Sequence, residues 1–166
     1  MAGPLPAQEG DLDQLYEQLA EAGPESYEQI EAQIIDAWAR SGSPSMDLLL
    51  RRGREALVDG DTLAAIEHLT ALIDHAPDFA EAHFLRANAY YKAGLIGPAL
   101  ADIEMTLALN PRHFEAIRAL ASVMEENARD EDALALYRMV LDYSPQSRQA
   151  LDAVHRLEVA QGGAAL

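Results

Sequence analysis

The chain has 166 residues, which is enough for one domain with a sizeable core and too few for two ordinary domains. Asp and Glu number 28 against 12 Lys and Arg, so the formal net charge is −16, which disfavours binding to nucleic acid or to anionic lipid. The sequence contains no cysteine, which excludes disulfides, thiolate metal sites and cysteine nucleophiles.

The first 45 residues are the most acidic part of the sequence, with nine acidic residues and one basic residue. We expect residues 1–10 to form a flexible N-terminus. Apolar residues at helical spacing, among them Leu19 and Trp38, then predict a pair of helices within residues 11–45. Because this pair lies one period ahead of the repeats that follow, we interpret it as a degenerate N-terminal repeat.

A 34-residue repeat occupies the middle of the chain. Prolines that end apolar runs recur at Pro77, Pro111 and Pro145, and three segments align in that frame without a gap. We name these segments repeats 1, 2 and 3, and they comprise residues 46–79, 80–113 and 114–147.

Each repeat has the pattern of two amphipathic helices separated by a turn. Gly60 and Asp61 form the predicted turn and N-cap of repeat 1, and Asp130 is the predicted N-cap in repeat 3. Small residues are expected where the two helices of a pair cross, because larger side chains would push the backbones apart. These small residues are Gly53, Ala65, Ala87, Ala99, Ala121 and Ala133.

The last part of the chain predicts a single helix over residues 148–161. A repeat array needs such a capping helix, because its last apolar face would otherwise meet water. We expect residues 162–166 to form a disordered tail, and the whole chain to form one continuous domain. No stretch is apolar enough for a membrane span, so no membrane insertion is expected.

The repeats resemble the tetratricopeptide repeat (TPR) family. Repeat 2 matches its pattern of small, aromatic and proline positions, whereas His83 and Arg86 stand where the family has large apolar residues. We expect these departures to weaken individual contacts. The resemblance implies an all-α fold, a TPR α-solenoid of antiparallel helix pairs in a right-handed superhelix. It would have three clear repeats, the degenerate N-terminal pair and the C-terminal capping helix.

Longer runs, such as residues 40–50 and 107–114, are similar to small alphaproteobacterial members of this family, whose role is poorly defined. Such proteins commonly begin with an export signal, and residues 1–10 show no pattern of one. The resemblance therefore implies a soluble, periplasmic protein whose signal was removed. If Met1 is the native start, a cytoplasmic location is expected instead.

The resemblance also implies a concave groove lined by the first helix of each repeat. Asn88 would bind the backbone of a peptide or partner helix, and Arg54 and Arg118 would bind its acidic groups. Leu50, Phe84 and Tyr91 would hold its apolar side chains. The alternative is that Phe84 and Tyr91 pack on neighbouring helices and leave a shallow groove. The predicted groove residues are Leu50, Arg54, Leu57, Phe84, Asn88, Tyr91, Lys92, Arg118, Ser122 and Glu125.

Chaperone-binding members of the family clamp a C-terminal carboxylate with basic and Asn side chains. Here only Arg54 offers a positive charge at the matching positions, so a clamp of this kind is not expected. The residues at those positions are Leu50, Arg54, Leu85, Glu115 and Ala119.

These observations predict a non-catalytic protein-interaction module that binds a protein or peptide partner and needs no cofactor. The sequence has no Gly-rich phosphate loop and no nucleophile or metalloprotease motif, so we do not expect an enzyme. The five histidines lack the spacing of metal ligands, and we interpret them as packing residues. Two alternatives remain: an acidic scaffold that contacts a basic partner through the N-terminal helices, and a structural protein that self-associates as a homo-oligomer.

Overall fold

The computed structural model describes residues 6–163, and that range contains helices and turns without a strand. The described chain forms two compact units, where the sequence predicted one continuous domain. Unit 1 contains residues 35–111. Unit 2 contains residues 7–34 together with residues 112–163. The division arises because the N-terminal helices contact residues of the C-terminal part of the chain, which belong to the same unit.

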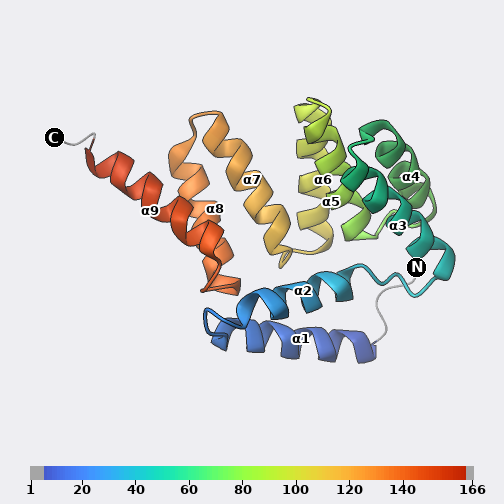
Figure 1. The fold of residues 1–166 in the computed structure, drawn as a ribbon, viewed down its shortest axis with the longest axis horizontal. Coiled ribbons are helices and arrows are strands. Elements are labelled where there is room, and N and C mark those ends of the chain that lie inside the picture. Colours follow the sequence, from blue (N-terminus) through green and yellow to red (C-terminus); the bar gives the residue numbers. More distant parts are fainter. Residues whose placement is uncertain (1–5, 164–166) are drawn as a thin grey trace. The chain divides into compact units, whose positions relative to one another are not determined.

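Unit 1 contains repeats 1 and 2 as two antiparallel helix pairs (Figure 1). The second helix of the first pair packs against the first helix of the second pair, which joins the repeats into one stack. The prediction of two helices for each repeat is confirmed. The helices are α3 (Pro44–Asp59), α4 (Thr62–His75), α5 (Ala80–Lys92) and α6 (Ile96–Leu109).

One of the predicted small residues of unit 1, Gly53, lies where its helix crosses the next, and the others are buried. A Cβ atom added to Gly53 on α3 would lie 2.6 Å from Cγ of Leu69 on α4, so only glycine fits this crossing. Ala65, Ala87 and Ala99 are buried with exposed fractions of 1% or less. The close approach of the two backbones therefore depends on these positions.

The turns inside the repeats share one geometry, in which a residue one or two positions after the first helix takes a left-handed backbone conformation. Gly60 has φ 78° and Gly94 has φ 77°, a region that glycine enters at little cost. The Asp61 carboxylate then accepts a hydrogen bond from the Ala64 amide at 3.0 Å, which confirms the predicted cap of α4. In repeat 3 the equivalent residue is Ala128, which has φ 57°.

Unit 2 contains repeat 3, the C-terminal helix and the N-terminal helices. Phe114, Ile117, Tyr137, Val140 and Leu157 form much of its buried apolar core. The repeat and capping helices are α7 (Phe114–Glu126), α8 (Asp130–Tyr143) and α9 (Arg148–Gly163).

Two boundaries in unit 2 differ from the predictions. The N-cap of α8 is Arg129, whose side chain makes no capping hydrogen bond, and Asp130 is the first helical residue. The Arg129 guanidinium lies 2.7 Å from Asp132 Oδ2 in the first turn. α9 continues to Gly163, past the predicted end at residue 161, and residues 164–166 lie outside the described residues.

The N-terminal hairpin consists of α1 (Pro6–Glu21) and α2 (Tyr27–Trp38). α1 begins within the segment that was expected to be flexible, since proline is tolerated in a first helical turn. Residues 1–5 lie outside the described residues.

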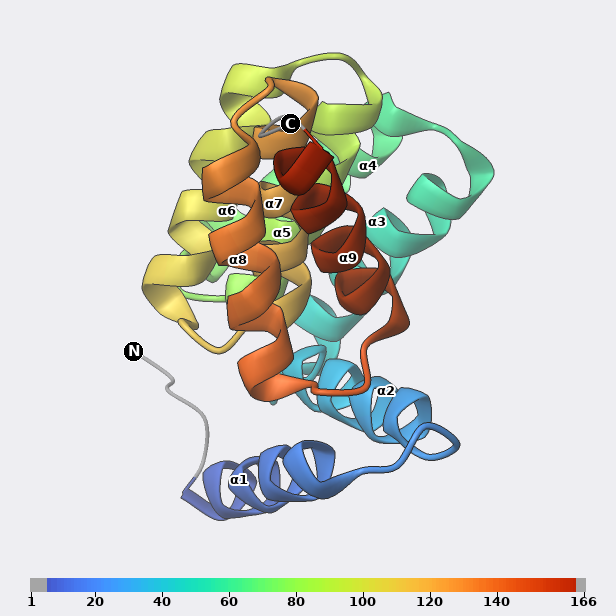
Figure 2. The ribbon, with the colours of Figure 1, turned by 90° about the vertical axis from the view of Figure 1, so that its left-hand side faces the viewer.

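The hairpin contacts the ends of the other helices of unit 2. Tyr16 Oη donates to the Arg112 carbonyl at 3.0 Å, and the Arg112 guanidinium lies 4.2 Å from the centre of the Tyr16 ring and 2.7 Å from Asp13 Oδ1. The Arg148 amide donates to Tyr27 Oη at 3.5 Å, beside the turn that joins α8 to α9 (Figures 1 and 2). The structure thus groups residues 7–34 with repeat 3. From the sequence, we interpreted the helix pair within residues 11–45 as a repeat that precedes repeat 1.

Candidate interaction surface

The ten predicted groove residues are divided between the two units, so each group is described within its own unit. Ser122 and the other two members from unit 2 belong to α7. The seven members from unit 1 belong to α3 and α5, and we call them the α3–α5 face: Leu50, Arg54, Leu57, Phe84, Asn88, Tyr91 and Lys92.

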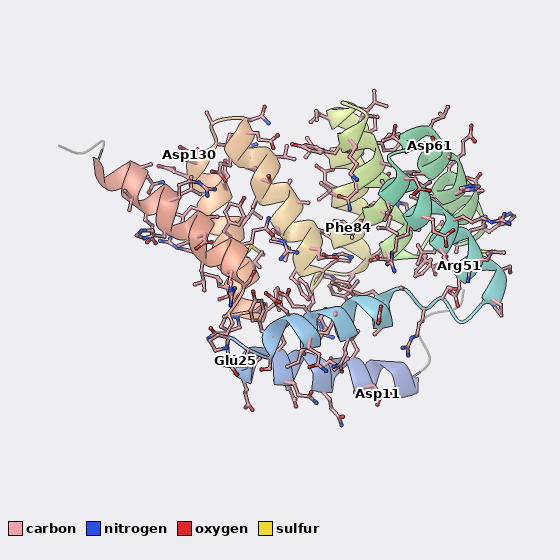
Figure 3. All side chains as sticks on the ribbon, viewed as in Figure 1. Asp11, Glu25, Arg51, Asp61, Phe84 and Asp130 are labelled. Atoms are coloured by element: carbon pink, nitrogen blue, oxygen red, sulfur yellow. The ribbon has the colours of Figure 1, made fainter. Side chains whose placement is uncertain are left out.

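Most apolar members of the α3–α5 face are buried. Leu50, Leu57 and Phe84 have exposed fractions of 3%, 7% and 6%, whereas Tyr91 is 37% exposed. Figure 3 shows Phe84 on α5 among the helices. The prediction that Leu50 and Phe84 serve as accessible anchors is therefore wrong, because both side chains are used in packing. Tyr91 is the apolar member of this face that reaches solvent.

The basic members of the α3–α5 face already have partners within unit 1. Arg54 Nη2 lies 2.8 Å from Oε1 of Glu81, a side chain that is only 1% exposed. A buried carboxylate requires a countercharge, and Arg54 supplies it here. Arg54 is therefore already paired and does not offer its charge to an acidic group of a ligand. Lys92 Nζ donates to the Leu57 carbonyl at 3.2 Å and so ties α5 to α3.

Asn88 differs from its neighbours on this face. Its side chain is half-buried on α5, with Phe84 four residues before it and Tyr91 three residues after it, which places all three on one side of the helix. The Asn88 amide has no hydrogen-bond partner among the residues that the structure describes. An amide in this position can both donate to and accept from the backbone of a bound chain.

In unit 2, the charged groove residues are also paired. Arg118 Nη2 lies 3.3 Å from Glu115 Oε1 on the same helix. Glu125 accepts two hydrogen bonds from Arg156 Nη2, at 2.7 and 2.9 Å, and one from Tyr137 Oη at 3.2 Å. The capping helix α9 therefore uses Glu125 as an anchor, and the predicted ligand roles of Arg118 and Glu125 are not supported by their contacts.

These contacts shift two pKa values in unit 2. Hydrogen bonds and charge attraction from Glu125 raise the pKa of the Arg156 guanidinium. Burial raises the pKa of the Tyr137 hydroxyl above 10.0, and the adjacent Glu125 carboxylate raises it further, because both disfavour the tyrosinate form.

A buried polar cluster joins α4, α5 and α6, and sequence reasoning missed it. Arg86 donates to both carboxylate oxygens of Asp102, at 2.7 and 2.9 Å, and to Thr70 Oγ1 at 3.2 Å. His83 Nδ1 lies 3.1 Å from Asp102 Oδ1, and its Nε2 lies 2.9 Å from the Pro77 carbonyl. Two departures from the repeat pattern thus share one carboxylate as their partner.

The charges of this cluster stabilise each other. Burial alone would raise the pKa of Asp102, but hydrogen bonds from Arg86 and His83 outweigh it and hold that pKa below its ordinary 3.8. The hydrogen bonds to Asp102 in turn raise the pKa of Arg86. Both ring nitrogens of His83 face acceptors, so the imidazolium form makes two hydrogen bonds here and the neutral ring makes one.

Two of the five histidines, His83 and His113, have hydrogen bonds inside the fold. His113 is completely buried, and its Nδ1 accepts a hydrogen bond from the Ala116 amide at the start of α7. Within the described chain, no group of three His, Asp or Glu side chains could hold a metal ion. None of the helices between residues 6 and 163 has the length and apolarity that a bilayer crossing requires.

Comparison with known proteins identifies the repeats. A tetratricopeptide repeat family model matches residues 50–101. A TPR repeat-containing protein of Rhizobium etli is 32% identical over 147 residues, which covers 88% of this chain and 72% of that protein. The chain belongs to the tetratricopeptide repeat family. The match extends over all three repeats and part of the N-terminal hairpin, well beyond the part that the family model covers.

More distant relatives share only the TPR segment. Hsp70-Hsp90 organizing protein 1 of Glycine max is 28% identical over 63% of this chain, and the human SGT1 homolog is 32% identical over 49%. The matched segments are 18% and 22% of those proteins' own lengths. This chain therefore corresponds to about a fifth of each.

Solved structures confirm the predicted all-α fold of TPR helix pairs. The first TPR of Spaghetti (RPAP3), bound to the HSP90 peptide SRMEEVD, superposes with a TM-score of 0.65 at 22% identity and covers 70% of this chain and 93% of its own. A point mutant of MamA gives a TM-score of 0.57 at 17% identity and covers 94% of this chain and 88% of its own.

Proposed function

We propose that this TPR protein is a non-catalytic interaction module that binds an extended peptide or a helix of a partner on the α3–α5 face of unit 1. The observation that carries this proposal is the half-buried Asn88 amide, which has no partner among the described residues and lies beside the exposed part of Tyr91. The amide reaches solvent, so it can exchange water for the backbone groups of a ligand.

The contacts of the α3–α5 face define the ligand more narrowly than the sequence did. Arg54 and Lys92 are engaged by Glu81 and Leu57, so the face offers no unpaired cation for a carboxylate. We therefore expect a ligand that presents backbone hydrogen-bonding groups to Asn88 and an apolar side chain to Tyr91. This differs from recognition of a C-terminal carboxylate, for which the matching TPR positions lack basic residues apart from Arg54.

The test uses a peptide selected from a random phage-display library on the full chain, with its affinity measured by calorimetry. Asn88→Ala should weaken binding about tenfold, as expected for the loss of hydrogen bonds to a ligand backbone. Tyr91→Ala should weaken it by a similar factor. Gln33→Ala, which removes an exposed amide from the N-terminal hairpin, is the matched control and should leave the affinity unchanged. Equal affinities for all four proteins would refute a role for the α3–α5 face.

A second candidate function rests on the acidic hairpin of unit 2. Residues 1–39 contain no basic residue, and the acids on α1 and α2 are largely exposed, although Asp13 is paired with Arg112. Such a surface attracts a basic partner. A Lys-rich peptide should then bind the full chain in a salt-sensitive manner, and Glu17→Lys with Glu21→Lys should abolish that binding. Binding that survives this double variant would exclude the hairpin.

A further inference from the structure

Repeat 1 carries an open hollow of about 440 Å³ that is separate from the α3–α5 face. One stripe of α3, one stripe of α4 and the turn between them line it, and Figure 3 shows Asp61 at that turn. Its floor contains the small side chains of Ala56 and Ala64. The lining residues are Arg52, Glu55, Ala56, Asp59, Asp61, Ala64 and His68.

The same positions of repeat 2 form a helix-stacking face. Arg86 on α5 reaches Thr70 on the preceding helix α4, and its guanidinium lies 5.7 Å from the centre of the Tyr90 ring. The residue at the Glu55 position, Ala89, is completely buried. Three lining residues of the hollow lie 34 residues before members of this face, in the pairs Arg52/Arg86, Ala56/Tyr90 and His68/Asp102.

In repeat 1 the equivalent face is open. Arg52 and Glu55 are exposed, and Ala56, Ala64 and His68 are half-buried. Every residue that lines the hollow belongs to α3, α4 or their turn, so no other described helix contributes to it. Ala56, where repeat 2 has Tyr90, leaves room for a side chain of an incoming helix.

The net charge of the residues around the hollow, which we call its rim, indicates what kind of partner can bind there. Among the lining residues, Glu55, Asp59 and Asp61 outnumber Arg52, and all four are exposed. Arg51 lies outside the lining, and its Nε is 3.7 Å from Glu55 Oε1 in a pair that is exposed on both sides, so a basic side chain of a partner can replace it. A second copy of this chain, with a net charge of −16, would be repelled by this rim. A basic partner would be attracted to it.

We propose that this hollow is a second interaction site, which binds a basic amphipathic helix of a partner protein in the manner in which α4 stacks on α5. A stripe of Ala and Leu on that helix lies over Ala56 and Ala64, and flanking Lys or Arg side chains pair with Glu55 and Asp59. A Thr or Ser hydroxyl accepts from Arg52, as Thr70 accepts from Arg86 in repeat 2.

The probe is a synthetic helical peptide of about 20 residues, with an Ala/Leu stripe flanked by Lys and Arg, and a second peptide in which Glu replaces the basic residues. Titration into the full ¹⁵N-labelled chain should shift the amide signals of Gly60, Asp61 and Ala64 with the basic peptide only. The double variant Glu55→Lys with Asp59→Lys should weaken binding about tenfold, because two attractions become repulsions. Ala56→Tyr, which installs the residue that repeat 2 carries, should block the site.

The control is Glu67→Lys with Glu104→Lys, which makes the same change of net charge at exposed positions outside the hollow and should keep near-wild-type affinity. Circular dichroism checks that each variant is folded. Absence of binding at millimolar peptide, equal binding of the acidic peptide, or shifts confined to Asn88 and Tyr91 would each overturn the proposal. Sedimentation equilibrium tests the other occupant: a dimer that Ala56→Tyr abolishes would assign the hollow to a second copy and also overturn it.

Discussion

Units 1 and 2 use charged side chains in opposite ways. Unit 1 buries them: Glu81 is 1% exposed and Asp102 is 6% exposed, and each is held by an arginine from another helix. Unit 2 keeps its equivalent pair near the surface, with 58% of the Arg156 side chain and 25% of the Glu125 side chain exposed. Since water screens the second pair and not the first, the same Arg–carboxylate contact should differ severalfold in its effect on stability.

The largest expected effect is the loss of Asp102. Asp102→Ala leaves the Arg86 guanidinium, 17% exposed, without its carboxylate, and removes one of the two hydrogen-bond partners of His83. Breaking a buried pair from one side costs about 3–5 kcal/mol of unfolding free energy, because the remaining charge is not compensated. Urea unfolding followed by circular dichroism measures this loss. Glu104→Ala removes an exposed acid from the same helix and should change the free energy by no more than about 0.5 kcal/mol.

The same carboxylate makes stability depend on pH. Because the folded-state pKa of Asp102 lies below its ordinary value of 3.8, the unfolded chain takes up this proton first as the pH falls. The stabilisation is complete above 3.8 and is lost as the pH falls from there through the folded-state pKa. The free-energy difference between the wild type and Asp102→Asn should therefore narrow in this acid range. A difference that widens there would contradict the assignment.

Sequence reasoning found the elements of this molecule better than its contacts. The helix pairs and the crossing at Gly53 follow from a local period, so each repeat predicts its own structure. The Tyr16–Arg112 contact joins residues 96 apart and leaves no local pattern, so the sequence could not indicate what the hairpin contacts. The pairing of Arg54 with Glu81 joins the first helices of two successive repeats. The repeat register could therefore have predicted this pairing.

For the candidate surface, the sequence predicted which residues lie in the groove but not which side chains pair with them. Asn88 and Tyr91 follow from the family pattern alone, and the structure places them on one side of α5. Arg118 and Glu125 also follow from the pattern, but whether a charge is available depends on side chains from other elements, such as Arg156 on α9. The repeat pattern thus predicts where a groove residue lies, whereas only the packed structure shows whether its side chain is already paired within the protein.

The helix crossing in repeat 1 should show the next largest effect. In Gly53→Ala, the new Cβ would lie 2.6 Å from Cγ of the completely buried Leu69, which must shift or push the helices apart. Such overpacking costs about 1–3 kcal/mol. Gly10→Ala, at an exposed position of α1, is the matched control, since no residue beyond its chain neighbours and its own helix backbone lies within 4 Å of the added Cβ, and it should be neutral or stabilising. Equal effects of the two variants would mean that the crossing is not tight.

The turns of repeats 2 and 3 should respond in opposite directions. Ala128 has the left-handed φ of 57° that Gly94 adopts without a Cβ atom. Ala128→Gly should stabilise the chain by about 1 kcal/mol, and Gly94→Ala should destabilise it by a similar amount. Thermal unfolding by calorimetry compares the two variants. Destabilisation by both would show that backbone entropy, and not the left-handed conformation, dominates at Ala128.

The smallest expected change in stability is that of the exposed Glu125–Arg156 pair of unit 2. The pKa of Tyr137 provides a second measurement of the same variant. Glu125→Ala should cost only about 0.2–1 kcal/mol, because Arg156 remains hydrated after its partner is lost. The variant should nevertheless lower the pKa of Tyr137, since burial remains but the neighbouring negative charge is gone. Glu158→Ala breaks the exposed pair with Arg138 at a similar cost and leaves the Tyr137 titration unchanged, because that pair does not touch the ring. NMR titration of ¹³C-labelled tyrosine separates the two variants, and an unchanged Tyr137 pKa in Glu125→Ala would mean that burial alone sets it.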